Sequence, residues 1–126
     1  MRAVMYYGPD VPITVETIAD PVPGPGELVL KVGRCGICGS DVHLTQEHGW
    51  MPVGMPLGHE FAGEVVAVGK DVEDFRLGDV VTALPAAGCG HCVACAEGLP
   101  MLCERPAEMT FCAGGFADYV RIVART

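Results

Sequence analysis

Four cysteines near the end of the chain have the spacing of a metal site. They follow the pattern C-x2-C-x2-C-x7-C within residues 85–106, here called the cysteine lobe: Cys89, Cys92, Cys95 and Cys103. Three closely spaced thiols and a fourth after a short loop can converge on one tetrahedral ion. Zinc held by four thiolates forms a closed structural site, with no position for a substrate. Because a glycine- and proline-bearing loop has little core of its own, the metal would also supply its folding energy.

A second group of possible ligands lies upstream of the lobe. Cys38, His59 and Glu60 offer a thiolate, an imidazole and a carboxylate, which form an incomplete ligand set for zinc. A catalytic zinc requires an incomplete set, because water or substrate must occupy the remaining position. Cys38 would precede a helix, whose N-terminal dipole favours the thiolate. Glu60 is also compatible with a solvated strand residue that binds no metal.

Three further residues could assist this second set. Asp41 can accept a hydrogen bond from the ring N–H of His59, which fixes the tautomer and raises the basicity of the ring. Ser40 and His43 are three positions apart on one helical face and could pass a proton between metal and solvent. Each also has a structural alternative, because Ser40 suits a helix N-cap, Asp41 suits the first turn, and His43 suits an exposed helical position.

Short strands separated by turns are expected to position these residues. Runs rich in β-branched or aromatic side chains occupy residues 2–6, 14–18, 28–32, 61–68, 80–84 and 119–123. This spacing predicts a mainly β fold, a meandering and partly open barrel. One short helix is expected from Ser40 to about Glu47. Beyond it, Trp50, Met51 and Met55 could line a substrate pocket, although ordinary loop packing is the commoner explanation for such residues.

Composition limits the classes of partner. The 126 residues fit one domain with a single core, and half of them are hydrophobic. Eight basic and sixteen acidic residues give a formal net charge of −8, which disfavours nucleic acid and anionic lipid. No apolar run approaches the roughly 18 residues of a membrane span, and no signal peptide is recognisable. We therefore expect a cytoplasmic protein with no membrane and no nucleic acid partner.

The cysteine count favours metal ligands over disulfides. Seven cysteines is an odd number, and without a signal peptide a secreted disulfide framework is disfavoured, although it stays an alternative for the lobe. Cys35 and Cys112 are left over once the proposed ligands are assigned. They are expected to behave as small buried hydrophobic residues.

Five segments taken together resemble one enzyme family. They are C-G-I-C-G-S-D-V-H at 35–43, G-H-E-F-A-G-E-V-V-A-V-G at 58–69, G-D-V-V at 78–81, the cysteine lobe, and G-G-F-A-D-Y-V at 114–120. In this order they resemble the N-terminal GroES-like catalytic domain of the zinc-dependent medium-chain dehydrogenases, which include alcohol and polyol dehydrogenases. The resemblance covers essentially the whole chain, residues 1–126.

The resemblance implies oxidation of a secondary alcohol, polyol or hydroxy-amino acid to a carbonyl, with hydride transfer to NAD or NADP. Cys38 and His59 match the first two catalytic zinc ligands, and Glu60 matches the adjacent glutamate, which ligates zinc in the polyol branch. Ser40 matches the hydroxyl that binds the substrate oxygen, and His43 matches the outer histidine of the proton relay. The intact enzyme is expected to be a homo-oligomer that acts on a small alcohol or polyol.

The cofactor-binding part of that family has no counterpart in the sequence. No G-x-G-x-x-G follows a strand and opens a helix, so no cofactor-binding residue and no Rossmann domain are expected here, and the chain alone should be inactive. One alternative is a stand-alone zinc-binding module used for oligomerisation or partner binding. Another is a quinone-type reductase with only the structural zinc, which the presence of Cys38, His59 and Glu60 disfavours.

Overall fold

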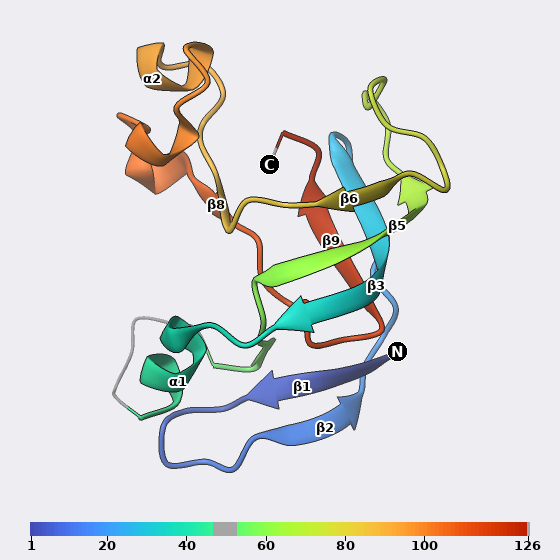
Figure 1. The fold of residues 1–126 in the computed structure, drawn as a ribbon, viewed down its shortest axis with the longest axis vertical. Coiled ribbons are helices and arrows are strands. Elements are labelled where there is room, and N and C mark those ends of the chain that lie inside the picture. Colours follow the sequence, from blue (N-terminus) through green and yellow to red (C-terminus); the bar gives the residue numbers. More distant parts are fainter. Residues whose placement is uncertain (47–52, 126) are drawn as a thin grey trace.

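Antiparallel strands form the body of the molecule (Figure 1). The computed structural model describes residues 1–46 and 53–125. The first sheet has the order β2-β1-β4, with β1 (Arg2–Tyr6), β2 (Thr14–Thr17) and β4 (Met55–Pro56). The second has the order β6-β5-β3-β9, with β3 (Glu27–Gly36), β5 (Glu60–Val68), β6 (Val80–Thr82) and β9 (Tyr119–Val123). A third pairs β7 (Ala86–Ala87) with β8 (Thr110–Phe111).

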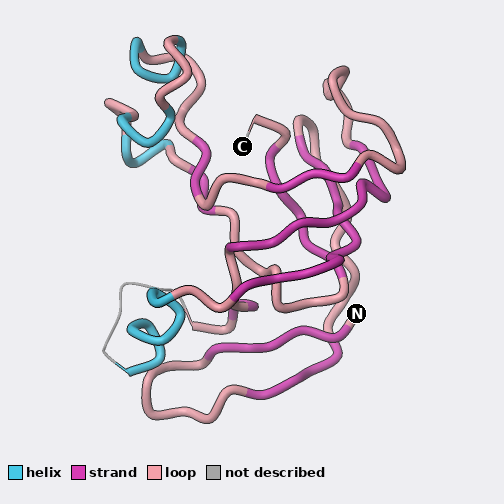
Figure 2. The backbone as a smooth tube through the Cα atoms, viewed as in Figure 1, coloured by secondary structure: helices cyan, strands magenta, loops and turns pink. Residues whose placement is uncertain are grey.

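In the described part of the chain, helical turns are confined to two places (Figure 2). α1 (Gly39–Gln46) follows β3, whereas α2 (Val93–Ala96) and the 3-10 turns Pro100–Leu102 and Pro106–Glu108 belong to the cysteine lobe and its return. The mainly β fold predicted from the sequence is confirmed. The predicted helix end at Glu47, and Trp50 and Met51, lie outside the described residues. Among the helices of residues 1–46 and 53–125, none is long and apolar enough to cross a bilayer.

β3 is longer than the sequence predicts, and its extra length positions the candidate ligands. The predicted strand ends at Val32, whereas β3 continues to Gly36. A register irregularity between Val32 and Arg34 lets β3 keep its pairing with β5, so that Gly36 lies opposite Glu60. Residues that follow β3 are therefore brought beside residues that precede β5.

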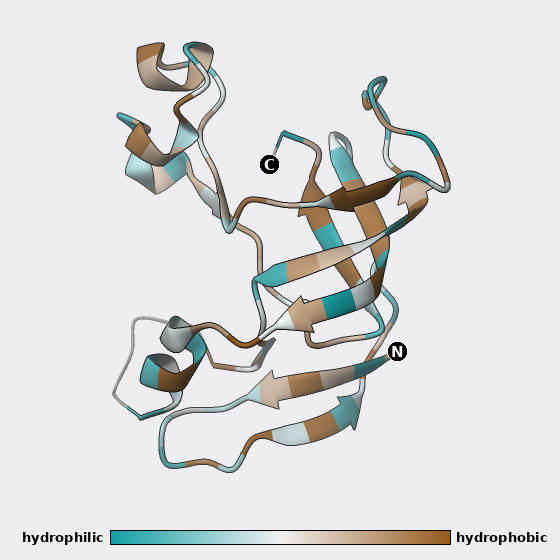
Figure 3. Cartoon of the chain, viewed as in Figure 1, coloured by the Kyte–Doolittle hydropathy of each residue, from teal (hydrophilic) through white to brown (hydrophobic). Residues whose placement is uncertain are grey.

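The hydrophobic core lies on one face of the second sheet. It contains Leu28, Leu30, Phe61, Val65, Cys112, Val120 and Ile122. Along β5 exposed and buried residues alternate from Glu60 to Val66, and Figure 3 shows hydrophobic and hydrophilic residues along the strands of this sheet. Because burying such a valine, leucine or phenylalanine side chain contributes about 1.5–3 kcal/mol, this pattern fixes which face of β5 turns inward. Glu60, at the start of β5, is thereby held on the exposed face.

The cysteine lobe projects from the barrel on a narrow base (Figure 1). At this base β7 and β8 pair through Ala86 with Phe111 and Ala87 with Thr110. The backbone N–H of Cys112 donates to the carbonyl of Pro85 at 2.9 Å, so the chain leaves and re-enters the barrel at nearly the same point.

An ion pair ties β1 to the segment before β9. Arg2 donates to Asp118 through its side-chain Nη2, at 2.9 Å from Oδ1, and through its backbone N–H, at 2.7 Å from Oδ2. These side-chain and backbone hydrogen bonds stabilise the carboxylate and lower the pKa of Asp118 to about 2 from its ordinary 3.8.

The contribution of Asp118 to stability should therefore depend on pH. A carboxyl whose pKa is depressed by folding stabilises the protein above its unfolded pKa of 3.8 and loses that effect as the pH falls through about 2. We expect Asp118→Asn to lower the melting temperature at pH 7, with the difference from wild type shrinking towards pH 2. Thermal unfolding followed by circular dichroism checks this, with Asp74→Asn, an exposed carboxyl, as control. A difference that is constant with pH would contradict it.

Candidate functional site

The pairing of β3 with β5 brings together the three candidate ligands of the second set. Cys38 follows the end of β3, while His59 and Glu60 lie at the start of β5. The Cys38 sulfur, a His59 ring nitrogen and a Glu60 carboxylate oxygen all lie within 4.8 Å of one another. A thiolate, an imidazole and a carboxylate at this separation can share one zinc ion, so the donor set fits the metal.

These ligands border a cavity of about 610 Å³. Arg34, Phe61 and Thr82 also line it. Cys38 and His59 are half-buried and Glu60 is exposed, so the set is accessible from solvent. A second cavity, of about 720 Å³, has a mainly apolar lining that includes Val15 but none of the three ligands, so it is not the metal centre.

The start of α1 differs from the prediction. The helix begins at Gly39, which places Ser40 inside the first turn and not at the N-cap. The turn is closed by Asp41, whose Oδ2 accepts the backbone N–H of Cys38 at 2.9 Å, while its own N–H donates to the Cys38 carbonyl at 3.1 Å. This reciprocal pair resembles a capping box and fixes Cys38 relative to the helix.

His59 lies between two residues of α1. Its Nδ1 is 3.4 Å from Asp41 Oδ1, and its Nε2 is 3.2 Å from Ser40 Oγ. The contact with Asp41 lacks hydrogen-bond geometry, so this oxygen is buried without a hydrogen-bond partner among the described residues. A carboxylate beside one ring nitrogen is the arrangement that orients a metal-binding histidine. Ser40 and Asp41 are thus both brought to the second set.

His43 is not brought to this set. It is exposed on α1, and no hydrogen bond or ion pair within residues 1–46 and 53–125 joins it to Ser40 or His59. Spacing along a helix placed Ser40 and His43 on one face, but Ser40 contacts His59 and His43 faces solvent.

The four lobe cysteines converge as their spacing predicts. Their sulfur atoms all lie within 4.8 Å of one another, with Cys89 and Cys95 at 4.0 Å and Cys92 and Cys103 at 4.0 Å. Zn–S bonds of about 2.3 Å in a tetrahedron place sulfurs about 3.8 Å apart, close to these distances. None of the described cysteines forms a disulfide, and these lobe sulfurs are far beyond the roughly 2.05 Å of an S–S bond.

Backbone N–H groups surround the lobe sulfurs. The N–H of Cys92 donates to the Cys89 sulfur at 3.4 Å, and the N–H groups of Cys89 and Arg105 each donate to the Cys103 sulfur at 3.4 Å. Such donors stabilise the thiolate form, which is the form that binds metal.

Two of the lobe thiols have pKa values shifted in opposite directions. The backbone N–H of Cys95, followed by that of Glu104, lowers the pKa of Cys92 to about 6. The backbone N–H of Gly90 acts to lower the pKa of Cys95, but burial and hydrogen bonds with the other three thiols outweigh it and raise that pKa to about 12. Without a cation, the thiolate of Cys92 is therefore favoured and that of Cys95 is disfavoured. A bound divalent ion would favour both thiolates and release protons.

Gly58 has a role that the sequence analysis did not assign. Its φ is +89°, and a Cβ there would lie 2.8 Å from both a ring carbon and the backbone nitrogen of Phe116. Its carbonyl accepts the N–H groups of Gly114 and Gly115, each at 2.9 Å. Only glycine tolerates this backbone with so close a neighbour, and the turn that it makes delivers His59 to the site. The sequence feature that could have indicated this role is a glycine directly before the candidate ligand His59.

The two cysteines left over pack as apolar residues. Cys112 is 3% exposed within the core, and Cys35 packs against the same cluster. Burial raises the pKa of Cys35, which disfavours its thiolate. Neither belongs to a group of possible metal ligands among the described residues.

Known proteins are similar to this chain in fold and in sequence. The alcohol dehydrogenase GroES-like domain family matches residues 24–126. A scyllo-inosose 3-dehydrogenase of Thermotoga maritima is 41% identical, over 90% of this chain and 33% of that protein. An L-threonine 3-dehydrogenase of Cutibacterium acnes is 35% identical, over 91% of this chain and 34% of that protein. The crystal structure of 2R,3R-butanediol dehydrogenase from Bacillus subtilis aligns with a TM-score of 0.80 and 34% identity, over 98% of this chain and 38% of that one.

The matches cover most of this chain but only part of each relative. The chain spans about a third of the length of the curated relatives, while almost all of its own length is matched. The 126 residues thus correspond to the GroES-like part of these enzymes. The chain belongs to the alcohol dehydrogenase GroES-like domain family, within the medium-chain dehydrogenases.

Proposed function

We propose that the chain is the catalytic-domain portion of a zinc-dependent dehydrogenase that oxidises a small secondary alcohol or polyol and transfers hydride to NAD or NADP. The observation that carries this proposal is the presence of two different ligand sets, an open one at Cys38, His59 and Glu60 and a closed one at the lobe cysteines. The names of the relatives, which are threonine, inosose and butanediol dehydrogenases, support a hydroxylated substrate. Hydride transfer, cofactor binding and the oligomeric state would be properties of the whole protein and not of this chain alone.

In this proposal each residue of the open set has a role. Cys38 and His59, with Glu60, would hold a catalytic zinc, which when bound supplies Lewis acidity to the substrate oxygen. Asp41 holds the His59 ring through the contact at Nδ1. Ser40, whose hydroxyl is 3.2 Å from His59 Nε2, would hydrogen-bond to the substrate hydroxyl and accept its proton while passing its own proton towards solvent.

The final proton transfer to solvent would use His43. This residue is exposed on α1, so a proton that reaches it can pass to water. Because no contact in the described part of the chain links it to Ser40, the substrate or cofactor would have to complete the path.

The zinc content of the purified chain tests the proposal. We expect Cys38→Ser to lose the zinc of the open set and keep that of the lobe, as measured by elemental analysis. In the whole enzyme the same variant should abolish NAD(P)-linked alcohol oxidation, because removal of a ligand removes the Lewis acid. Retained turnover would contradict this mechanism. Unchanged zinc content would mean that this chain holds only the lobe metal and that the open set needs the rest of the enzyme to bind its own.

A further inference from the structure

The cysteine lobe is held together by polar contacts that its sulfur ligands do not explain. The imidazole of His91 donates from Nδ1 to the carbonyl of Cys89 at 3.0 Å, and its Nε2 lies 3.2 Å from Glu108 Oε2. Both ring nitrogens face oxygen atoms, so the ring bridges the Cys89 carbonyl and the Glu108 carboxylate. The imidazole therefore connects the turn that carries the first ligand to the 3-10 turn beyond the last one.

Glu108 continues this path to the fourth ligand. Its Oε1 accepts a hydrogen bond from Arg105 Nη1 at 3.1 Å, and the backbone N–H of Arg105 donates to the Cys103 sulfur at 3.4 Å. A polar chain thus runs from the carbonyl of Cys89 through three side chains to the sulfur of Cys103. It joins the first and last ligands of the lobe without passing through the metal position.

The fourth ligand is the one that most needs such support. Cys103 is separated from Cys95 by a loop of seven residues, whereas the first three cysteines are only three positions apart. Loss of metal from a four-thiolate site requires one ligand to withdraw first, and the segment on the longest loop has the most freedom to do so. Large apolar side chains in this loop, including Leu99 and Leu102, are 48% and 67% exposed, so packing does little to hold it.

We propose that His91, Glu108 and Arg105 form a latch that holds the Cys103 segment against the Cys89 turn and slows release of the lobe metal. The inference rests on the proposed zinc at the four cysteines. The three are positioning residues, because the metal position is already surrounded by four sulfurs. The competing possibility is that His91 and Glu108 bind metal themselves, since their donor atoms and the Cys89 sulfur also lie within 4.8 Å of one another.

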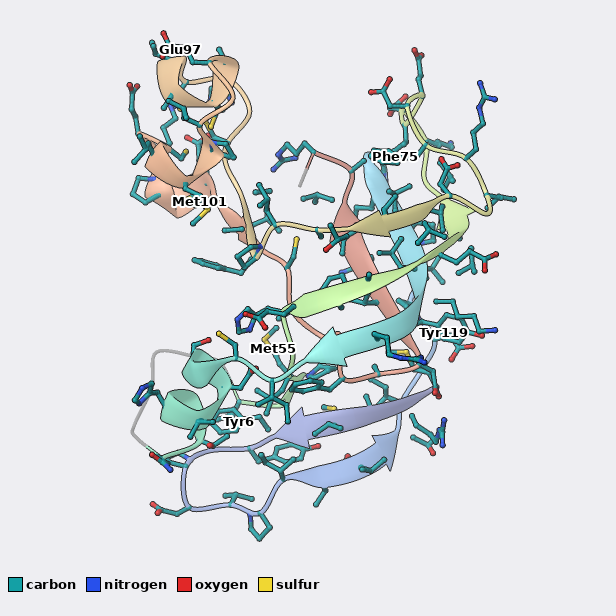
Figure 4. All side chains as sticks on the ribbon, in the orientation of Figure 1. Tyr6, Met55, Phe75, Glu97, Met101 and Tyr119 are labelled. Atoms are coloured by element: carbon teal, nitrogen blue, oxygen red, sulfur yellow. The ribbon has the colours of Figure 1, made fainter. Side chains whose placement is uncertain are left out.

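The rate of zinc release to a chromogenic chelator tests the latch. Cys38→Ser is the starting chain, so that only the lobe carries metal. We expect His91→Ala and Glu108→Ala each to speed release about three- to ten-fold, in the range of one or two exposed charged contacts. The double variant should release zinc no faster than the faster single variant, because either change opens the same path. Glu97→Ala, at the outer end of the lobe (Figure 4), removes the same charge and should change the rate less than two-fold.

Cobalt substitution separates the latch from a ligand role. The Co(II) absorption bands of a four-thiolate site should be identical in the starting chain and in His91→Ala, and a changed spectrum would make His91 a ligand and overturn the latch. If the Glu108→Ala variant binds one zinc and releases it at the same rate as the starting chain, the latch is also overturned, while the structural zinc stands. Failure of the starting chain to bind zinc would overturn the zinc site and the latch with it.

Discussion

Replacement of Cys103 by serine is expected to release the zinc of the cysteine lobe and unfold that lobe, while the barrel keeps its strands. The structural reason is that the lobe has almost no apolar core to replace the metal, since Met101 is 59% exposed and Val93 is 63% exposed. Structural zinc in small peptides contributes an apparent binding free energy of about 10–16 kcal/mol at neutral pH, which is also folding free energy. Elemental analysis should show the lobe zinc missing, and backbone amides of residues 89–103 should lose their protection from hydrogen exchange.

A matched cysteine outside the ligand set provides the control. Cys112 is buried in the core of the second sheet and belongs to no group of possible ligands in residues 1–46 and 53–125. Cys112→Ala should lower global stability modestly by leaving a small cavity and should keep the lobe zinc. A Cys103→Ser protein with full zinc content and full amide protection would show that the lobe does not depend on the metal.

Gly58→Ala is expected to cost about 3 kcal/mol or more of stability and to weaken zinc binding at the open set. The φ of +89° disfavours any side chain by roughly 1–2 kcal/mol. The new Cβ would also meet the backbone nitrogen of Phe116 at 2.8 Å and the Cys35 sulfur at 2.9 Å. Phe116 cannot move aside easily, because its N–H donates to the carbonyl of Leu57 at 2.9 Å. Relief of the clash must therefore displace His59.

A second glycine separates the two contributions. Gly78 has nearly the same φ, +91°, but a Cβ there would meet nothing within 4 Å. Gly78→Ala should therefore show only the backbone cost and should leave zinc at Cys38, His59 and Glu60 unchanged. Urea denaturation of both variants, with zinc content measured in parallel, gives the comparison. Equal losses of stability would mean that the contact with Phe116 carries no cost.

The fold could be predicted from the sequence where local pattern and pairing agree. The bounds of β1 and β9 match the predicted ranges, and four of the five residues of β9 are β-branched or aromatic. β4, β7 and β8 were missed, since strands of two residues carry no periodic signal and exist only through their partners. β3 was predicted too short because Gly33 and Arg34 have little strand propensity, and pairing with β5 overrides it.

In the site, too, contacts between near neighbours in sequence could be predicted, whereas contacts that depend on long-range pairing could not. Spacing was sufficient to bring together Cys89, Cys92 and Cys95, which are near neighbours in sequence. The approach of Cys38 to His59 depends on the long-range pairing of β3 with β5, which spacing along the chain does not reveal. From the sequence, their shared role is a hypothesis based on ligand chemistry and a family resemblance. The contact of His91 with Glu108 has no local signal, because it joins a residue beside the first lobe ligand to one beyond the C-terminal end of the lobe.

The narrow base of the cysteine lobe makes it an interchangeable module. The N–H of Cys112 bonds to the carbonyl of Pro85 at 2.9 Å, so the two chain ends of the lobe are adjacent, and Arg125 Nε adds a contact at 3.0 Å from the segment after β9 to the carbonyl of Gly88. Extending or shortening an insertion between fixed ends changes the closure entropy only slowly with length, by roughly 0.6 kcal/mol per doubling. A lineage could therefore acquire, shorten or discard this insertion at one point without rebuilding the sheet beneath it. The same geometry makes the lobe a candidate for grafting onto other hairpins.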